Sequence, residues 1–129
     1  MKVIPSAPVK WWMVFAFGGL GALGRVALLG LFPVQSALFG TLLVNSLGCL
    51  AIGVLFQWFE VRELLAAEVR TGLVAGLLGG FTTFSAFGLE LLELLEEGRL
   101  LAGLGYAAGS VLLAVGAAAL GALLARQVL

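Results

Sequence analysis

Apolar residues fill four long stretches of the chain, at about residues 12–32, 37–59, 69–92 and 101–124. Each stretch contains the roughly 20 mostly apolar residues that a helix needs to cross a bilayer. Short polar connectors separate the stretches, so the pattern predicts an all-α integral membrane protein with four transmembrane helices. Because the stretches use nearly the whole chain, we expect residues 1–129 to form a single four-helix transmembrane domain.

The connectors carry most of the charge and bear on topology. The short turn containing Pro33 and Ser36 predicts that the first two helices are antiparallel neighbours. An even number of crossings places both termini on one side, and the distribution of Lys and Arg modestly favours that side being the cytoplasm. The bias leaves room for insertion in both orientations. With the termini inside, Arg99 lies outside and Arg25 lies nearer the outer side. The inner basic residues are then Lys2, Lys10, Arg62, Arg70 and Arg126.

The third stretch contains a run that is poorly suited to a continuous transmembrane helix. Residues 79–87 hold two adjacent glycines, two adjacent threonines and a serine. In lipid, backbone groups that leave a helix must find partners inside the protein or beside a polar cavity. Broken transmembrane helices of this kind often form ion sites near the bilayer midplane. We therefore expect the third helix to be broken at mid-membrane, where an ion meets the chain.

Glycines recur at every fourth position in the third and fourth stretches. Small residues at this spacing let helix backbones approach each other closely in lipid. They indicate either tight packing within one protomer or a dimer interface, and the sequence leaves both interpretations open. A protomer with so few spans would need a partner to enclose much of a pathway. The repeats are Gly72, Gly76 and Gly80 in the third stretch, and Gly105 and Gly109 in the fourth.

Two short polar stripes lie inside the second and fourth stretches. Thr41 and Asn45 share one helical face with Gly48, and Tyr106 and Ser110 are likewise four residues apart. These groups either join helices by hydrogen bonds or present donors to an anion. Neutral polar stripes without intramembrane Asp, Lys or His resemble a lined pathway more than a proton relay.

Aromatic and charged residues add to this picture. Phe81, Phe84 and Phe87 recur at every third position. They either pack in the bundle or present their electropositive ring edges to a small anion. Arg25 either extends to the interface or attracts anions into a vestibule. Glu90, with the acidic residues that follow it at 93 and 97, is interpreted as a solvated helix end.

Composition excludes several classes of protein. Hydrophobic residues make up 62% of the chain and charged residues 11%, with a mean hydropathy of +1.17. This leaves no room for a soluble catalytic domain, so no enzymatic activity is expected. The formal net charge of zero does not indicate a nucleic-acid partner. The single Cys49 can form neither an intrachain disulfide nor a thiolate cluster and is interpreted as an apolar filler.

Four motifs together resemble one family, the small bacterial fluoride channels known as Fluc or CrcB. The resemblance covers essentially the full length of the chain. The run at 79–85 is its most specific part, and the glycine-rich run at 21–25 alone would be weak. The matching elements are Gly21-Ala22-Leu23-Gly24-Arg25, Gly40-Thr41-Leu42-Leu43-Val44-Asn45-Ser46-Leu47-Gly48, Gly79-Gly80-Phe81-Thr82-Thr83-Phe84-Ser85, and the pair Tyr106 and Ser110.

The resemblance implies an antiparallel, dual-topology homodimer in the inner cell membrane, with two anion pores. It also implies a structural sodium ion on the dimer axis, held by the backbone carbonyls of Gly79 and Thr82. Ala86 stands where the family commonly has a hydroxyl residue, which removes one polar contact or shifts it to Thr83 or water. The candidate pore and anion-binding residues are Asn45, Phe84, Phe87, Ser85, Thr83, Tyr106, Ser110, Thr41 and Arg25.

The function that the resemblance implies is passive, fluoride-selective export that lowers the toxicity of fluoride in the cytoplasm. The alternative is a coupled small-ion or multidrug exporter of the four-span dimeric type. Such a multidrug exporter needs a membrane-embedded acid, whereas the first stretch contains Arg25 and no carboxylate. A fluoride/proton antiporter would need a coupling group such as Glu90. A non-transporting assembly subunit would leave the clustered polar groups unexplained.

Overall fold

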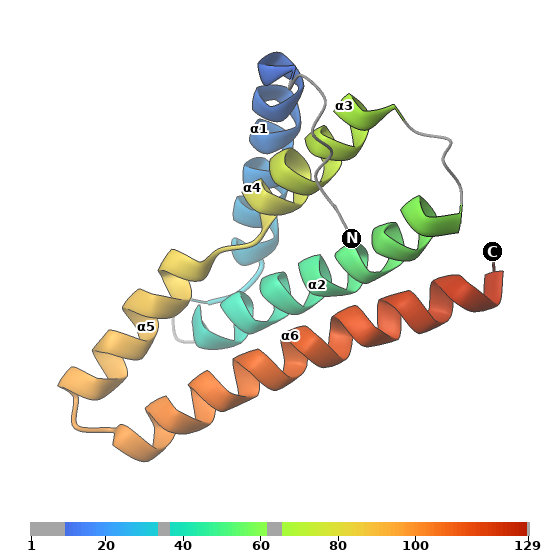
Figure 1. The fold of residues 1–129 in the computed structure, drawn as a ribbon. Helices are drawn as coiled ribbons and strands as arrows, with labels where there is room; N and C mark the ends of the chain where they lie inside the picture. Colours follow the sequence, from blue (N-terminus) through green and yellow to red (C-terminus); the bar gives the residue numbers. More distant parts are fainter. Residues whose placement is uncertain (1–9, 34–36, 62–65, 129) are drawn as a thin grey trace.

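The computed structural model describes residues 10–33, 37–61 and 66–128, and all the regular elements in this part of the chain are helices (Figure 1). Four of its helical segments are long and apolar enough to cross a membrane, at Trp11–Leu29, Ala37–Phe59, Ala67–Glu96 and Leu100–Val128. They follow the order of the four predicted spans and confirm the all-helical prediction. The elements are α1 (Trp11–Leu29), α2 (Ala37–Val61), α3 (Ala67–Thr71), η2 (Gly72–Leu78), α4 (Gly79–Phe81), α5 (Phe84–Glu96) and α6 (Leu100–Val128).

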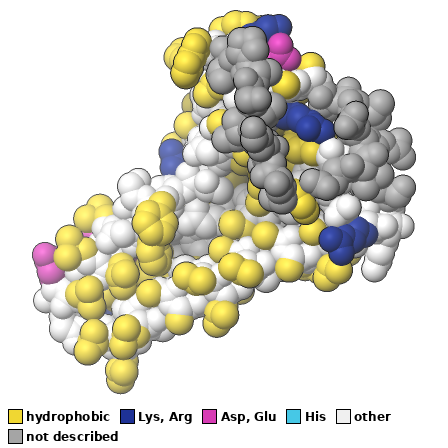
Figure 2. Space-filling view, viewed as in Figure 1, with side chains coloured by type: hydrophobic (Ala, Val, Ile, Leu, Met, Phe, Trp, Pro, Cys, Tyr) yellow, Lys and Arg dark blue, Asp and Glu magenta, His cyan; other side chains and the backbone are white. Residues whose placement is uncertain are grey.

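Large apolar side chains lie on the outside of the molecule. Phe15 on α1 is 84% exposed, and Leu101 on α6 is 85% exposed. Figure 2 shows apolar side chains spread over much of the visible surface. A water-soluble protein of this size would bury such residues, whereas a membrane protein presents them to lipid tails. The exposed apolar surface therefore agrees with the hydropathy of the four spans.

Helices α2 and α6 lie side by side and run in the same direction (Figure 1). Glycine makes their close approach possible. A Cβ atom at Gly53 would collide with the backbone of Ala118, and one at Gly121 would collide with the backbone of Leu50. Because the two helices are parallel, polar residues that are one turn apart on α2 lie beside polar residues that are one turn apart on α6.

Helix α1 packs mainly against η2 and α4 and makes few contacts with α2. The turn at 34–36, on which the prediction of antiparallel neighbours rests, lies outside the described residues, and α1 contacts the third span more extensively than it contacts α2. Glycine again explains the packing, since a Cβ atom at Gly80 would collide with the carbonyl of Gly18. The glycine repeat of the third span thus serves packing within one protomer. Gly105 and Gly109, by contrast, have open space around them.

The segment η2 is a π-helix that the sequence pattern does not predict. It spans Gly72–Leu78, and the N–H of Gly79 donates to the carbonyl of Val74, five residues earlier. Such wide turns are rare and occur frequently at functional sites. Two of its glycines, Gly72 and Gly76, lie against the side chain of Phe17 on α1. The π-helix therefore occupies the closest contact between the first and third spans.

The third span is interrupted directly after η2 and α4. Thr82 (φ −79°, ψ 160°) and Thr83 (φ −147°, ψ 116°) are extended, and α5 begins at Phe84. The structure confirms the predicted interruption and narrows it to the two threonines, whose β-branched side chains favour extended backbone. Gly79 and Gly80 remain helical, and Gly80 lies against the backbone of Gly18 in α1.

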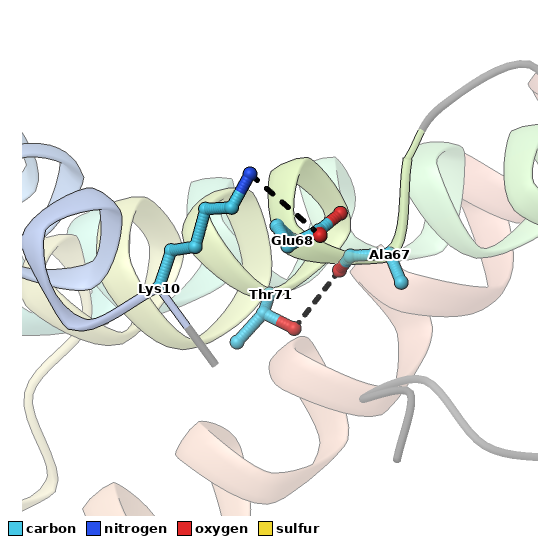
Figure 3. A network of polar contacts seen from close by, with 4 residues as sticks. All are labelled: Lys10, Ala67, Glu68 and Thr71. Atoms are coloured by element: carbon cyan, nitrogen blue, oxygen red, sulfur yellow. Dashed lines mark hydrogen bonds and ion pairs between the residues drawn. The ribbon is translucent and has the colours of Figure 1, made fainter. Parts of the chain in front are cut away.

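The ends of the spans are joined by polar contacts. Lys10, before α1, lies 3.7 Å from a carboxylate oxygen of Glu68 in α3, and the Thr71 hydroxyl donates to the Ala67 carbonyl at 3.0 Å (Figure 3). The side chain of Lys10 is 55% exposed, so this ion pair orients the ends but contributes little to stability. The ion pair links the start of the third span to the start of the first, whereas the Thr71 hydrogen bond lies within α3.

Replacing Gly21 with alanine is expected to destabilise the fold by about 1–3 kcal/mol, the usual cost of overpacking. A Cβ atom there would collide with the backbone of Leu77 in η2. Gly19→Ala is the matched control, because a Cβ atom at Gly19 meets nothing within 4 Å. Reversible unfolding in mixed micelles should show a lower unfolding free energy for the first variant only. Equal values for both variants would contradict the packing described here.

Candidate functional site

Asn45 on α2 holds the interruption in the third span through two hydrogen bonds to one residue. Its amide nitrogen donates to the carbonyl of Thr83 at 2.9 Å, and its amide oxygen accepts from the N–H of Thr83 at 2.8 Å. Thr83 is only 7% exposed, so water does not easily replace these bonds. The side chain thus replaces the partner that the broken helix no longer provides to the Thr83 N–H, and adds a second donor to the carbonyl with which α5 begins.

The interruption releases the carbonyls of Gly79 and Thr82 from their helical partners. In a continuous α-helix the N–H of Thr83 would bond to the Gly79 carbonyl, but here it donates to Asn45. The N–H of Ala86 would likewise bond to the Thr82 carbonyl, but it donates to the Thr83 hydroxyl at 3.2 Å. These two carbonyls are the ones that the family resemblance assigns to a cation.

Arg25 on α1 contacts one of these released carbonyls. Its guanidinium donates to the carbonyl oxygen of Thr82 at 3.2 Å. The side chain is therefore directed toward the interruption rather than fully toward solvent, and Arg25 is half-buried. Thr82 is thus approached by an arginine from α1, while its neighbour Thr83 is held by an amide from α2.

A pocket of about 260 Å³ opens beside the interruption, between α2, α5 and α6. It brings together six of the candidate residues from the sequence, and four of these have hydrogen-bonding side chains, which come from three different spans. The hydroxyl oxygen of Ser110 is buried and has no hydrogen-bond partner within the described structure. These six lining residues are Asn45, Thr82, Thr83, Phe84, Phe87 and Ser110, and the others are Leu42, Cys49, Val111 and Ala114.

A row of aromatic rings begins at the pocket lining with Phe84 and Phe87 and continues beyond the lining to Tyr106. The ring centroids of Phe84 and Phe87 are 5.3 Å apart, and those of Phe87 and Tyr106 are 5.2 Å apart. Phe84 is 83% exposed on the protomer. Phe81, in contrast, lies close to Gly24 and Gly48, so it packs between α1 and α2. The periodic phenylalanines therefore divide into one packing residue and two that line the pocket.

Glu90 on α5 is not the solvated helix end that the sequence predicts. One carboxylate oxygen accepts from the Thr41 hydroxyl at 2.6 Å, and the other accepts from the Tyr106 hydroxyl. Thr41 is 2% exposed, so the carboxylate is held within the bundle. The spacing of Phe84, Phe87 and Glu90, three residues apart on one helix face, is the sequence signal that could have identified it.

A second pocket lies beyond Glu90, at the end of α5. Its volume is about 250 Å³, and its lining includes Glu90, Glu93, Glu97 and Arg99. Glu97 and Arg99 form an exposed ion pair at 3.1 Å. The polar residues thus follow one another from this acidic end of the bundle, through Glu90, to the pocket at the interruption.

The remaining candidate residues lie around the first pocket rather than on its lining. Thr41 and Tyr106 meet at Glu90, one helical turn from Asn45 and Ser110. Ser85 is exposed, and its hydroxyl lies 3.3 Å from the hydroxyl of Thr83. Cys49 was interpreted as an apolar filler, and the structure adds that it lines the pocket.

The chemistry of this site is that of neutral donors, aromatic rings and backbone carbonyls. No group of three or more His, Cys, Asp or Glu residues that could hold a metal ion occurs within the described parts of the chain. The amide of Asn45 and the hydroxyl of Ser110 can donate to an anion. Neutral donors bind an ion weakly enough for it to leave again, as conduction requires.

Comparison with known proteins gives a consistent result. The family model described as CrcB-like protein, Camphor Resistance (CrcB), matches residues 12–122. Fluoride-specific ion channel FluC 2 of Nocardia farcinica is 41% identical over 127 residues, covering 97% of this chain and 91% of that protein. The FluC protein of Nitrobacter winogradskyi is 38% identical over 131 residues, covering 93% of this chain and all of that protein.

A shorter match reaches higher identity. Fluoride-specific ion channel FluC of Pseudomonas fluorescens is 56% identical over 71 residues, which is 55% of this chain and 57% of that protein. The match therefore spans little more than half of this relative. The family model and the two longer alignments cover the interruption, the polar stripes and α1 together. On these grounds, the chain belongs to the CrcB-like family.

Proposed function

We propose that this protein is a fluoride-selective channel that lets fluoride leave the cytoplasm passively across the inner cell membrane. The observation that carries the proposal is the pocket in which Asn45, Thr83 and Ser110 meet the rings of Phe84 and Phe87. A hydrogen-bonding amide, hydroxyls and electropositive ring edges are the neutral groups that suit a small, strongly hydrated anion. The relatives in the family carry the name fluoride-specific ion channel.

In this proposal Asn45 can both join two helices by hydrogen bonds and present a donor to an anion, the two interpretations that the sequence leaves open. Its amide nitrogen has two hydrogens, and the bond to the Thr83 carbonyl uses one of them. The second hydrogen is left to donate toward the pocket, together with the hydroxyl of Ser110. Asn45 therefore both shapes the interruption and offers an anion one donor.

Passive flow is sufficient for export. Hydrogen fluoride is a weak acid that enters a cell as a neutral molecule and dissociates in the more alkaline cytoplasm, where fluoride is trapped. The negative membrane potential drives anions outward, and each elementary charge gains about 2.3 kcal/mol per 100 mV. An open anion path thus lowers internal fluoride without a pump.

We further propose that the working unit is the antiparallel homodimer. Phe84 is 83% exposed on the protomer although it lines the pocket, so a second copy would enclose the ring and complete the wall. The glycines at 105 and 109 on α6 leave room for a close neighbour. These features support a dimer, and the family resemblance supplies the dual topology.

The dimer would hold a structural sodium ion at the carbonyls of Gly79 and Thr82. Both carbonyls are released from helical hydrogen bonding, and unwound backbone carbonyls are suitable ligands for sodium in broken transmembrane helices. Each protomer would contribute one Gly79 carbonyl and one Thr82 carbonyl. When bound, the ion would supply a fixed positive charge that joins the two interruptions.

Fluoride efflux from liposomes tests the channel proposal. Liposomes that contain the purified protein are expected to release fluoride rapidly when valinomycin lets potassium carry the compensating charge, and to retain chloride. A fluoride electrode and a matched chloride measurement record the two ions. The control is a proton gradient in either direction, because a proton-coupled exporter using Glu90 would change its rate with the gradient and a passive channel would not. Absence of fluoride efflux from folded protein would contradict the proposal.

A further inference from the structure

We propose that Arg25 is a tethered cation that competes with sodium for the Thr82 carbonyl, and so lowers the affinity of the protein for the ion. The proposal rests on the sodium site of the proposed function and adds a residue that sets its affinity. The observation behind it is the hydrogen bond from the Arg25 guanidinium to the Thr82 carbonyl oxygen at 3.2 Å.

The Thr82 carbonyl attracts a positive group because the break leaves it without its backbone donor. The N–H of Ala86 donates to the Thr83 hydroxyl instead. In a low-dielectric environment an unpaired carbonyl is costly, so it is stabilised by whichever cationic partner reaches it. Arg25 reaches it from α1, which the glycine contacts with η2 and α4 hold close.

The Gly79 carbonyl is in a different position. Its helical donor, the N–H of Thr83, is taken by Asn45, and Arg25 contacts Thr82 rather than Gly79. The two proposed ligands are therefore unequal: one is released, and the other is shared with an arginine. A sodium ion would have to displace the guanidinium from Thr82 or accept a like charge beside it.

Either outcome weakens sodium binding. Like charges separated by a few ångström repel strongly wherever water does not screen them. Arg25 would stabilise the interruption when the ion is absent, and would make the bound ion exchangeable rather than permanent.

Sodium titration of neutral Arg25 variants tests this competition. The full-length protein in detergent is unfolded by heat at increasing sodium chloride, with choline chloride holding the ionic strength constant. Because an ion that binds only the folded state raises its stability, the sodium dependence gives an apparent Kd. Arg25→Gln is expected to bind sodium about tenfold more tightly than the unchanged protein. Arg25→Lys, which keeps the charge, should stay within about threefold of it.

Two further variants keep the test decisive. Arg25→Met is a second neutral variant in case the glutamine variant does not fold, and Arg99→Gln removes an exposed arginine at the far end of the bundle. Unchanged or weaker sodium affinity in a folded neutral variant would overturn the proposal, as would the absence of sodium-dependent stabilisation in the unchanged protein. Fluoride efflux is measured separately, so a protein that binds sodium without conducting fluoride would contradict the channel and not the competition.

Discussion

Replacing both Phe84 and Phe87 with isoleucine is expected to slow fluoride efflux by about 100-fold, if each ring contributes about 1.4 kcal/mol to the passage of the ion. Both rings line the pocket, with their centroids 5.3 Å apart. Isoleucine keeps the apolar character of each side chain but has no electropositive edge. The measurement is the rate of valinomycin-dependent fluoride efflux from liposomes.

Phe81→Ile is the matched control for this double variant. Phe81 belongs to the same periodic series, but it packs near Gly24 and Gly48 and does not line the pocket. It should affect stability rather than the rate of efflux. Wild-type efflux from a folded protein with both substitutions would show that the rings are only packing residues, the interpretation that their spacing alone also allows.

Replacing Asn45 with leucine is expected to lower the free energy of unfolding by about 1–3 kcal/mol, because the buried N–H of Thr83 would be left without its hydrogen-bond partner. The Thr83 carbonyl would also lose the Asn45 donor, but it keeps its helical partner at the start of α5. An ordinary interhelical hydrogen bond in a membrane protein contributes only about 0.6 kcal/mol on average. Reversible unfolding in mixed micelles therefore separates a residue that replaces helical hydrogen bonds from one that merely joins two helices.

Gln57→Leu provides the comparison on the same helix. The amide oxygen of Gln57 accepts one hydrogen bond, from Arg126 at 2.8 Å, in an exposed position. Water can replace that partner, so the substitution should cost less than about 0.5 kcal/mol. If the free energy of unfolding fell by the same small amount in both leucine variants, the hydrogen bonds between Asn45 and Thr83 would not be what holds the interruption in place.

The features that the sequence predicts are those that depend on residues within a single apolar stretch. The length of the apolar runs predicts four spans, and the adjacent Thr82 and Thr83 predict an interruption within a few residues of where it occurs. Spacing of four residues also places Asn45 beside Thr41, and Ser110 beside Tyr106. These predictions succeed because hydropathy and helical periodicity depend on residues close together in the chain.

The features that the sequence does not predict depend on which helices meet. Glu90 lies near the end of a helix, where a carboxylate is usually solvated, but its partners come from α2 and α6. Arg25 donates a hydrogen bond to the carbonyl of Thr82, which lies 57 positions further along the chain. The short turn after α1 indicates only sequence adjacency, whereas glycine contacts direct α1 onto η2. Such pairings require the packed arrangement of all four spans.

The π-helix makes the length of the third span as important as its composition. Its wider turns take up about one more residue than an α-helix over the same rise. Deleting one residue from Gly72–Leu78 would therefore let the segment close into an ordinary α-helix and leave the residues that follow near their present orientation. Deleting one residue from α4, which has no such extra residue, would rotate everything that follows by about 100°. The Thr82 carbonyl would then turn away from Arg25, and Thr83 would turn away from Asn45. Across the family, the π-helical segment should therefore tolerate the loss of one residue better than α4 does.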